Sequence, residues 1–444
     1  MNHLSNLPFF EIQFTKSAEI YDPAAVDQLR DGIRTENLTD LIVISHGWNN
    51  DMAEARYLYD HIFEFVGDEL AAASLQGKKF GILGIYWPSK KFAEEELIAG
   101  GEAAGLTVSP EAEYVQEQIT ELHGFFDDKQ SDAHLMEIAQ QIERSEYGDT
   151  DKQKVYEAIS ALFRPILQRQ EEQKDEDAAV TLTTSNIQEV VISLEPEDDA
   201  PIAPAGEGGV ASIGELNSSN IMDGGAAGSV FSFKGLLGGL RNVLNLGTYY
   251  QMKERAGKVG TLGLNPLIHR VQTENPAIKI HLIGHSFGAR LVTSAIAGTS
   301  ADKALQVQSL ILLQAAFSHF SFAQNYEDQK DGSFRRIIDQ SNIKGATVIS
   351  HTRNDKAVGL AYAIASRVAK QVADALGDRN DFYGGLGSNG AQATPGVKTY
   401  QLVQGTSYNF EASSIYNLHA DTTIDGHSGI ANKAVAEVIA AVIL

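Results

Sequence analysis

The sequence predicts an α/β protein whose mostly parallel sheet is interrupted by a helical insertion. Short apolar runs rich in β-branched residues alternate with segments of helical periodicity, first between residues 41 and 87 and again after residue 231. Between these two stretches the strand signal disappears. Alternating strands and helices imply a largely parallel sheet with helices on both faces, and ligand groups gather at the carboxyl ends of the strands in such folds.

Residues 1–88 are predicted to form the amino-terminal part of the sheet core. The run at 41–44 is typical of a buried strand, the segment 53–66 has helical spacing, and the run at 80–87 is typical of the next strand. This strand, helix and strand order is the repeating unit of a parallel sheet.

Residues 89–230 are expected to form a helical insertion or lid. Its second half, about residues 171–228, combines charge runs at 171–177 and 195–199 with a stretch rich in Gly, Ala, Pro and Ser at 201–228, which predicts a flexible segment. Its first half places apolar residues at helical spacing in three groups, which are Val115, Ile119, Leu122 and Phe126, then Leu135, Ile138 and Ile142, then Val155, Ile159 and Leu162.

Residues 231–444 are predicted to complete the sheet core. Helical patterns occur at 249–259 and 289–297, and a terminal helix is predicted at 431–444. Strand-like runs occur at 278–283, 309–313, 346–350 and 399–403.

Composition excludes several classes of function. The chain has 444 residues, a formal net charge of −23 and no cysteine. Disulfides, thiol nucleophiles and cysteine-ligated zinc are therefore excluded, and so acidic a chain is expected to repel nucleic acid. No apolar run is long enough to cross a bilayer, and residues 1–14 lack the pattern of a secretory signal, so we expect a cytoplasmic protein.

Gly284-His285-Ser286-Phe287-Gly288 is the segment that points most directly to chemistry. A strand-like run precedes it and a helical pattern follows, so the serine is expected in a sharp turn with its hydroxyl exposed. Glycine is needed at both ends because a side chain there would collide with the neighbouring strand or helix. The alternative is that Ser286 only caps the helix.

The chain resembles the serine hydrolases of the α/β-hydrolase superfamily. His46-Gly47 after the first predicted strand, the Gly284 to Gly288 turn, and an aspartate and a histidine after later strands carry the resemblance. It does not extend to the insertion at 89–230. The family usually places its cap after the strand that follows the nucleophile helix, whereas that connection here, residues 317–344, is too short for a large cap.

The resemblance implies a catalytic triad in the order serine, acid, histidine. A serine hydroxyl is a poor nucleophile at neutral pH, so a histidine must accept its proton and a carboxylate must hold that histidine in the correct tautomer. Asp355 follows the strand at 346–350 and occupies the position of the acid, with a loop or helix-capping role as the alternative. Its competitors lie farther from a predicted strand end, and they are Asp328, Asp331 and Asp339.

His427 occupies the position of the base, directly before the terminal helix. His419 lies in the same predicted connection and is its rival. A metal site made of His419, Asp421 and His427 is a further alternative, although neither the ligand spacing nor a helix face supports it. We expect no metal and no cofactor.

Acyl transfer also needs donors for the oxyanion. The resemblance assigns them to the backbone NH groups of Phe287 and Trp48, with His46 and Gly47 as the supporting loop. Gly47 allows the backbone to approach the nucleophile. An ordinary strand-to-helix turn, capped by Asn50 or Asp51, is the alternative, and both descriptions can hold together.

These residues lead us to expect a carboxylesterase or lipase-like enzyme that acts through an acyl-enzyme intermediate on a small-molecule or lipid ester. Acyl transfer and amide or thioester cleavage use the same residues, and a noncatalytic scaffold is the third class. The oligomeric state is not predicted.

Overall fold

The computed structural model describes residues 2–75, 77–89, 115–116, 119–128, 130–145, 149–172, 233–326, 329–355, 357–358 and 384–444. The chain divides into two compact units. The first comprises Met1–Ser89, Met252–Tyr362 and Gly377–Leu444, and the second comprises Lys90–Gln251 and Ala363–Leu376. From residue 173 onward, the segment predicted to be flexible lies outside the described residues.

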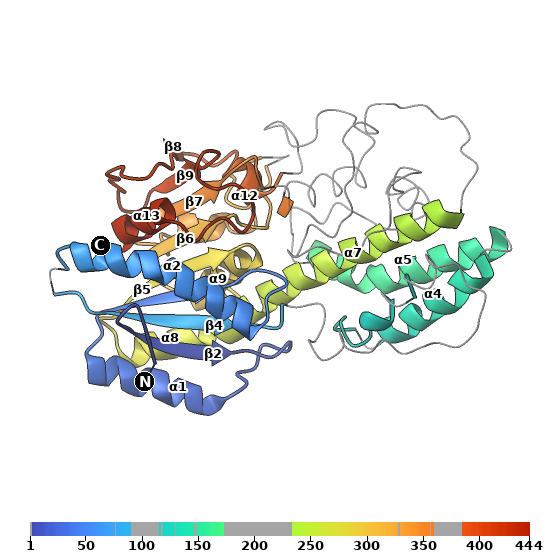
Figure 1. Ribbon diagram of the computed structural model, residues 1–444, viewed down its shortest axis with the longest axis horizontal. Helices are drawn as coiled ribbons and strands as arrows, with labels where there is room; N and C mark the ends of the chain where they lie inside the picture. The colour runs from blue at the N-terminus through green and yellow to red at the C-terminus, as the bar shows by residue number, and fades with distance from the viewer. Residues whose placement is uncertain are drawn as a thin grey trace. The chain divides into compact units, whose positions relative to one another are not determined.

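The first unit is built on a nine-stranded sheet with the order β1-β2-β4-β3-β5-β6-β7-β9-β8 (Figure 1). β1 pairs with β2 in antiparallel fashion, and the other neighbours in the sheet are parallel. The predicted α/β class with a mostly parallel sheet is therefore confirmed. The strands are β1 (Asn2–Leu4), β2 (Leu7–Gln13), β3 (Asp40–Ser45), β4 (Phe80–Tyr86), β5 (Lys279–His285), β6 (Ser309–Leu313), β7 (Thr347–His351), β8 (Lys398–Gln401) and β9 (Ile415–His419).

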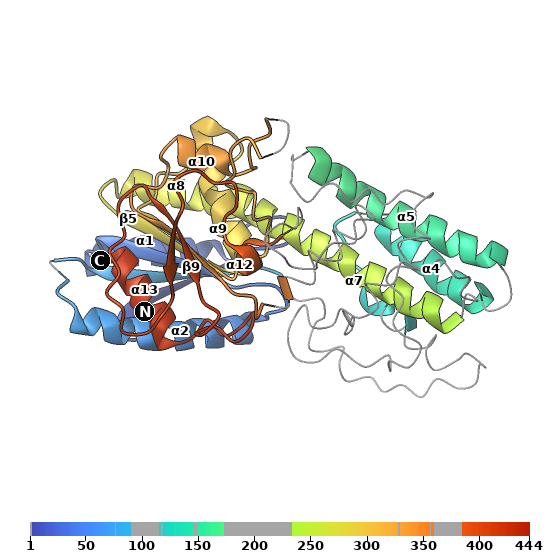
Figure 2. The ribbon, with the colours of Figure 1, turned by 90° about the horizontal axis from the view of Figure 1, so that it is seen from above.

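Helices cover both faces of this sheet (Figure 2). On one face α2 (Met52–Ala72) packs against α13 (Lys433–Ile443). On the other, α9 (Phe287–Ala297) packs against α8 (Asn265–Glu274) and the π-helix η3 (Val259–Leu264). The described residues of this unit also form α1 (Pro23–Glu36), η4 (Ala301–Lys303), α10 (Arg335–Asp339) and α12 (Leu386–Asn389).

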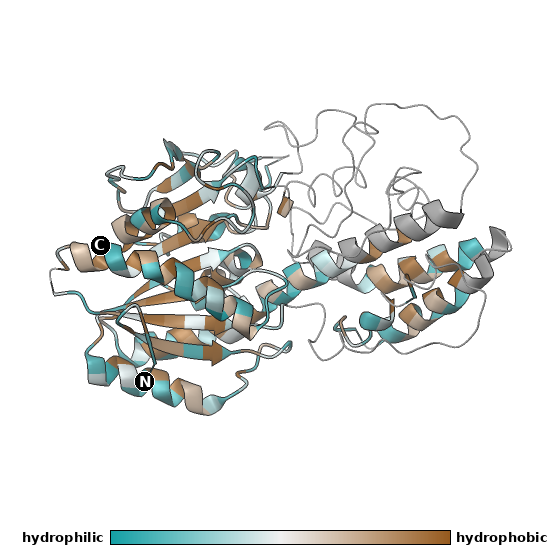
Figure 3. Cartoon of the chain, viewed as in Figure 1, coloured by the Kyte–Doolittle hydropathy of each residue, from teal (hydrophilic) through white to brown (hydrophobic). Residues whose placement is uncertain are grey.

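The central strands are buried on both faces, which explains why they are continuous apolar runs in the sequence. Every residue of β3, β4 and β6 is buried. Ile42 and Ile44 join the apolar cluster beneath α2 and α13, whereas the buried Leu41 and Val43 alternate with them and point to the opposite face. Figure 3 shows these strands as strongly hydrophobic and α2 as mixed.

The sequence pattern does not reveal β9. The run predicted at 399–403 corresponds to β8 at the edge of the sheet, and β9 follows it in the chain but lies between β7 and β8. Asn417 interrupts the apolar run of β9, and its buried amide is satisfied by the backbone NH of Ala391 at 2.9 Å and its carbonyl at 3.1 Å. His419 is the last residue of β9, so the expectation that it lies in the connection to the terminal helix is wrong.

Helices dominate the described part of the second unit. α4 (Ser131–Ser145) packs against α5 (Asp149–Glu172), and α7 (Phe233–Lys258) contains the boundary between the units. The apolar residues that the sequence places on helical faces are buried, from Val115 through Ile138 to Leu162. Among the described residues, no helix combines the length and the hydrophobicity that a membrane span requires.

A buried polar chain links the amino-terminal ends of three neighbouring strands. His281 of β5 lies 3.1 Å from Asp40 Oδ1 of β3 through Nε2, and 2.8 Å from the Ser309 hydroxyl of β6 through Nδ1. Burial lowers the pKa of His281. Burial raises the pKa of Asp40, but hydrogen bonds from His281 and Thr39 outweigh it and lower that pKa overall. The side chains of His281 and Asp40 are 1% exposed, so this Ser-His-Asp chain holds strands together and is closed to substrate.

Replacing His281 alone should lower the free energy of unfolding more than replacing His281 and Asp40 together. We expect His281→Leu to lower the free energy of unfolding by about 3–5 kcal/mol, because it leaves the Asp40 carboxylate buried without its imidazole donor. Adding Asp40→Leu removes the charge as well and should recover most of the loss. Urea unfolding followed by circular dichroism measures both variants against the unaltered protein. A double variant no more stable than His281→Leu would contradict this account.

Candidate active site

Ser286 forms the sharp turn between β5 and α9. Its backbone has φ 57° and ψ −125°, which non-glycine residues rarely adopt and which costs about 1–3 kcal/mol. A Cβ at Gly284 would collide with the Cα of Ala289 in α9, and one at Gly288 would collide with the carbonyl oxygen of Ser45 at the end of β3. Both glycines are therefore required by the close packing of helix and strand around the turn.

Ser286, His427 and Asp355 form a continuous hydrogen-bonded chain. Ser286 Oγ lies 2.8 Å from His427 Nε2, and His427 Nδ1 lies 2.9 Å from Asp355 Oδ2. Because a carboxylate only accepts, Nδ1 carries the imidazole proton and Nε2 is left as the acceptor for the serine hydroxyl. Ser286 precedes α9 but its side chain makes no capping hydrogen bond, so helix capping does not account for it.

Asp355 uses its two carboxylate oxygens for different partners. Its side chain is fully buried. Oδ1 accepts from the backbone NH of Val358 at 2.9 Å, so the capping role considered for this residue is present. Oδ2 accepts from His427 and also from the side-chain amide of Gln314 at 3.1 Å. The cap and the contact to the histidine are therefore compatible.

Gln314 is a residue of this site that the sequence analysis does not identify. It follows β6 directly, is fully buried and has φ 46°. Its amide group donates to Asp355 Oδ2 at 3.1 Å and to the Gly387 carbonyl at 3.0 Å, while the Ser350 hydroxyl donates to its Oε1 at 2.9 Å. These bonds fix the Asp355 carboxylate. A polar residue directly after a buried strand beside the nucleophile strand is the sequence signal that marks it.

The structure separates His427 from its alternatives. His419 Nε2 lies 2.9 Å from Asp421 Oδ2. His427 commits both ring nitrogens to Ser286 and Asp355, so it does not share a metal site with those two residues. Among the rival aspartates, Asp339 is paired with an arginine of its own helix, Asp331 accepts a backbone NH of its own loop, and Asp328 lies outside the described residues.

The loop after β3 lies against the nucleophile turn. A Cβ on Gly47 would come within 2.6 Å of Ser286 Cβ and 3.1 Å of its Oγ, so only glycine fits where the loop passes the serine. His46 is buried, and its Nδ1 donates to the Gly47 carbonyl at 2.9 Å while its Nε2 accepts from the backbone NH of Trp87 at 3.3 Å. Burial lowers the pKa of His46 to about 4, so its ring is neutral near pH 7.

Trp48 and Phe287, the residues predicted to supply oxyanion donors, are neighbours. Their ring centroids lie 6.1 Å apart. Phe287 opens α9, where backbone NH groups lie at the positive end of the helix dipole. Asp51 caps α2 in a capping box with Glu54, so the loop is also the strand-to-helix turn that the alternative description expects.

His285 ends β5 and lies beside His427. Its Nε2 is 2.9 Å from the His427 carbonyl oxygen, and the two ring centroids are 4.9 Å apart. Burial lowers the pKa of His285 to about 3, so this ring is neutral as well. Its position in the sequence, directly before Ser286, does not indicate this contact to a residue 142 positions away.

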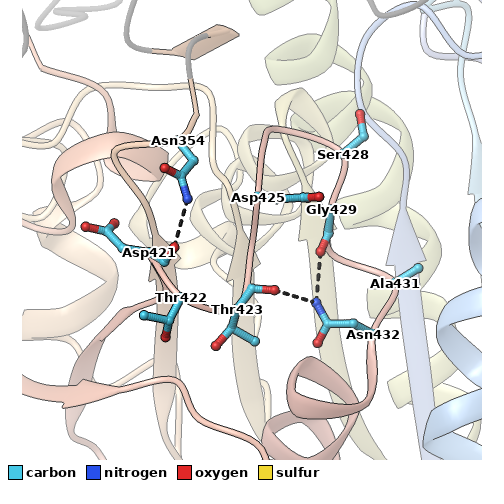
Figure 4. Close-up of a pocket in the computed structure, with 9 residues that line it drawn as sticks. All are labelled: Asn354, Asp421, Thr422, Thr423, Asp425, Ser428, Gly429, Ala431 and Asn432. Carbon is cyan, nitrogen blue, oxygen red and sulfur yellow. Dashed lines mark hydrogen bonds between the residues drawn. The ribbon is translucent and has the colours of Figure 1, made fainter.

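A pocket of about 520 Å³ is lined mainly by residues 421–432, the segment that carries His427 (Figure 4). Asn354 donates to the Asp421 carbonyl at 2.9 Å, and Asn432 donates to the Gly429 carbonyl at 2.9 Å, so side-chain amides fasten both ends of this segment. Ser286, Asp355 and His427 do not line the pocket. The lining residues are Asn354, Asp421, Thr422, Thr423, Asp425, Ser428, Gly429, Ala431 and Asn432.

Fold and site together define an α/β protein with a hydrogen-bonded serine, histidine and aspartate at the carboxyl ends of parallel strands. Comparison with protein-family models, curated proteins and solved structures finds no match to this chain.

Acid should destabilise this protein through two buried histidines of the site, His46 and His285. The pKa of His46 is about 4 and that of His285 about 3 when folded, against an ordinary value of 6.5. As the pH falls below about 6.5, the unfolded chain binds protons that the folded chain does not, so the free energy of unfolding decreases. Each histidine contributes up to about 1.4 kcal/mol per pH unit. Urea unfolding between about pH 7.5 and pH 5 measures this slope, and a flat profile over that range would contradict it.

Proposed function

We propose that this protein is a serine hydrolase that cleaves carboxylic esters. The observation that carries the proposal is the chain from Ser286 Oγ to His427 Nε2 at 2.8 Å and from His427 Nδ1 to Asp355 Oδ2 at 2.9 Å. A nucleophile, a base within hydrogen-bond reach and a third group that orients the base are the geometric requirements of covalent acyl transfer. The strained turn supports the same role, because backbone strain of this kind concentrates at active sites.

In the proposed first half-reaction, Ser286 Oγ forms a bond to the ester carbonyl carbon while its proton passes to His427 Nε2. The carbonyl π electrons move onto the oxygen, and the Asp355 carboxylate stabilises the imidazolium without taking its proton. The tetrahedral intermediate then breaks its bond to the alkoxy group. That group takes the proton from His427 and leaves as an alcohol, which gives the acyl-enzyme.

In the second half-reaction, water replaces the alcohol. His427 takes a proton from the water as its oxygen bonds to the acyl carbon, and the collapse of the second intermediate breaks the bond to Ser286 Oγ. The serine recovers its proton from His427, and the carboxylic acid leaves. All atoms and protons balance over the cycle with the enzyme's own residues and water.

We assign the oxyanion donors to the backbone NH groups of Phe287 and Trp48. The position of Phe287 at the start of α9 and the contact between its ring and that of Trp48 support this assignment. Gly47 supports it too, because the loop passes Ser286 within contact distance. Loss of one such donor costs about 3 kcal/mol of transition-state stabilisation in other acyl-transfer enzymes.

We also propose that the first unit has the α/β-hydrolase fold. In support, the nucleophile follows β5 in the middle of the sheet, and the loop proposed to hold the oxyanion follows the adjacent β3. The acid follows β7 and the base follows β9, both on the other side of β5. That the insertion acts as a lid stays a prediction.

Replacement of the nucleophile should abolish turnover. For Ser286→Ala we expect hydrolysis of 4-nitrophenyl esters to fall by about 10⁴-fold or more with the fold intact, because no other group supplies the attacking oxygen. A series from acetate to palmitate would also show which acyl length the protein prefers. Ser428→Ala, at an exposed serine beside His427, is the matched control and should keep normal turnover.

A fluorophosphonate probe gives a second measurement of the same proposal. It should label Ser286 in the unaltered protein and leave Ser286→Ala unlabelled. Turnover that survives in Ser286→Ala would identify another nucleophile. Absence of both labelling and ester hydrolysis in the unaltered, folded protein would overturn the proposal.

A matched pair of histidine variants tests the base. We expect His427→Gln to lower kcat by about 10³-fold or more, because a glutamine amide is not basic enough to take the serine proton. His419→Gln should stay within about threefold of the unaltered protein, because His419 contacts Asp421 at the end of β9. Steady-state kinetics with 4-nitrophenyl acetate measures both. Equal losses in the two variants would contradict the assignment of His427.

A further inference from the structure

We infer that His285 is a positioning residue that holds the main chain of His427 in place for the reaction. This inference rests on the proposed function, because it gives His285 a part in the same site. It concerns a contact to the backbone of the base, which is separate from the side-chain contacts that define the triad.

The hydrogen bond joins the direct neighbour of the nucleophile to the base itself. His285 precedes Ser286 in the chain, and its Nε2 lies 2.9 Å from the carbonyl oxygen of His427. A carbonyl oxygen only accepts, so Nε2 carries the proton and donates. The two rings lie 4.9 Å apart at 39°. The distance between nucleophile and base is therefore set by two hydrogen bonds, one from the His285 ring to the His427 main chain and one between Ser286 and the His427 ring.

The ends of the segment that carries His427 are fastened by Asn354 and Asn432, but the residues beside His427 lie near the surface. A Cβ at Gly426 would meet no atom within 4 Å, and the flanking Asp425 and Ser428 are exposed. The side-chain bonds of His427 orient the ring but leave its backbone to follow the loop. The donor at the end of β5 adds a constraint between those fastened ends, because it holds the backbone carbonyl of His427 itself.

This constraint matters most in the middle of the proposed cycle. Once Ser286 Oγ is acylated it has no proton to donate to His427 Nε2, so that contact to the nucleophile is lost. The hydrogen bond that His427 Nδ1 donates to Asp355 and the one that His285 donates to the His427 carbonyl oxygen persist. Together they keep Nε2 where it takes a proton from the incoming water.

Stability alone does not explain an imidazole at this position. His285 Nδ1 is buried and has no hydrogen-bond partner among the residues that the structure describes. An unpaired buried acceptor costs about 1–3 kcal/mol, whereas an apolar ring in the same space avoids that cost. What the imidazole provides is the Nε2 donor. Because burial lowers the pKa of His285 to about 3, it provides this donor without placing a positive charge beside His427.

Two substitutions at one position separate the donor from the ring. His285→Phe keeps an aromatic ring and removes the donor, whereas His285→Gln loses the ring and offers an amide NH in its place. With 4-nitrophenyl acetate we expect His285→Phe to lower kcat by about 10- to 100-fold with KM within about twofold, because a misplaced catalytic group affects the chemical step. His285→Gln should recover about tenfold or more of that loss when the donor is restored.

Fluorophosphonate labelling distinguishes positioning from folding. The final extent of labelling gives the fraction of molecules whose Ser286 can react. The rate of labelling reports how strongly the serine is activated. We expect His285→Phe to reach the normal end point at a reduced rate. A low end point with a normal rate, an unchanged kcat in His285→Phe, or equal losses in both variants would overturn the inference. If the unaltered protein is neither labelled nor active, the proposed function fails, and this inference fails with it.

Discussion

The close approach of the β3 loop to the nucleophile turn is the constraint on which the rest of the site depends. β3 and β5 pair in parallel with Ser45 opposite Gly284, so the two strands end together and the loop passes directly over Ser286. The turn is also held from the other side, because Ser286 NH donates to the Leu313 carbonyl at 3.1 Å. The strained conformation of Ser286 is thus stabilised by strand pairing, by the start of α9 and by glycines that leave no room for another arrangement.

The sequence patterns that predicted the core are those with a simple physical origin. Strands buried on both faces must be continuously apolar, and this identified the runs that became β3, β4, β5, β6 and β7. β9 was not predicted, because the polar Asn417 interrupts its apolar run. Asn417 is buried there because its amide is hydrogen-bonded to the backbone of Ala391, and a local sequence pattern does not show such a contact. α1 was also missed, although Asp22 as its cap and Pro23 in its first turn were visible signals.

The same distinction applies to the site. Ser286, Asp355 and His427 could be picked out because each follows a strand end or precedes a helix, and parallel strands bring such positions together. Gln314 and His285 also lie at strand ends, but the contacts that give them a role are not visible in the sequence: Gln314 donates to a carboxylate from another strand end, and His285 donates to a backbone carbonyl 142 residues away. Their residue types alone do not indicate these contacts.

Solvent exposure differs along the hydrogen-bonded chain of Ser286, His427 and Asp355. The Asp355 side chain is 0% exposed, whereas that of His427 is 17% exposed. The carboxylate is insulated from bulk water by Gln314 and the backbone of Val358, so water does not compete with the imidazole for its oxygens. Of these two side chains, only that of His427 is therefore in contact with bulk water. In the proposed reaction, exchange of protons with water would therefore take place at the imidazole, which is also the group that contacts Ser286 Oγ.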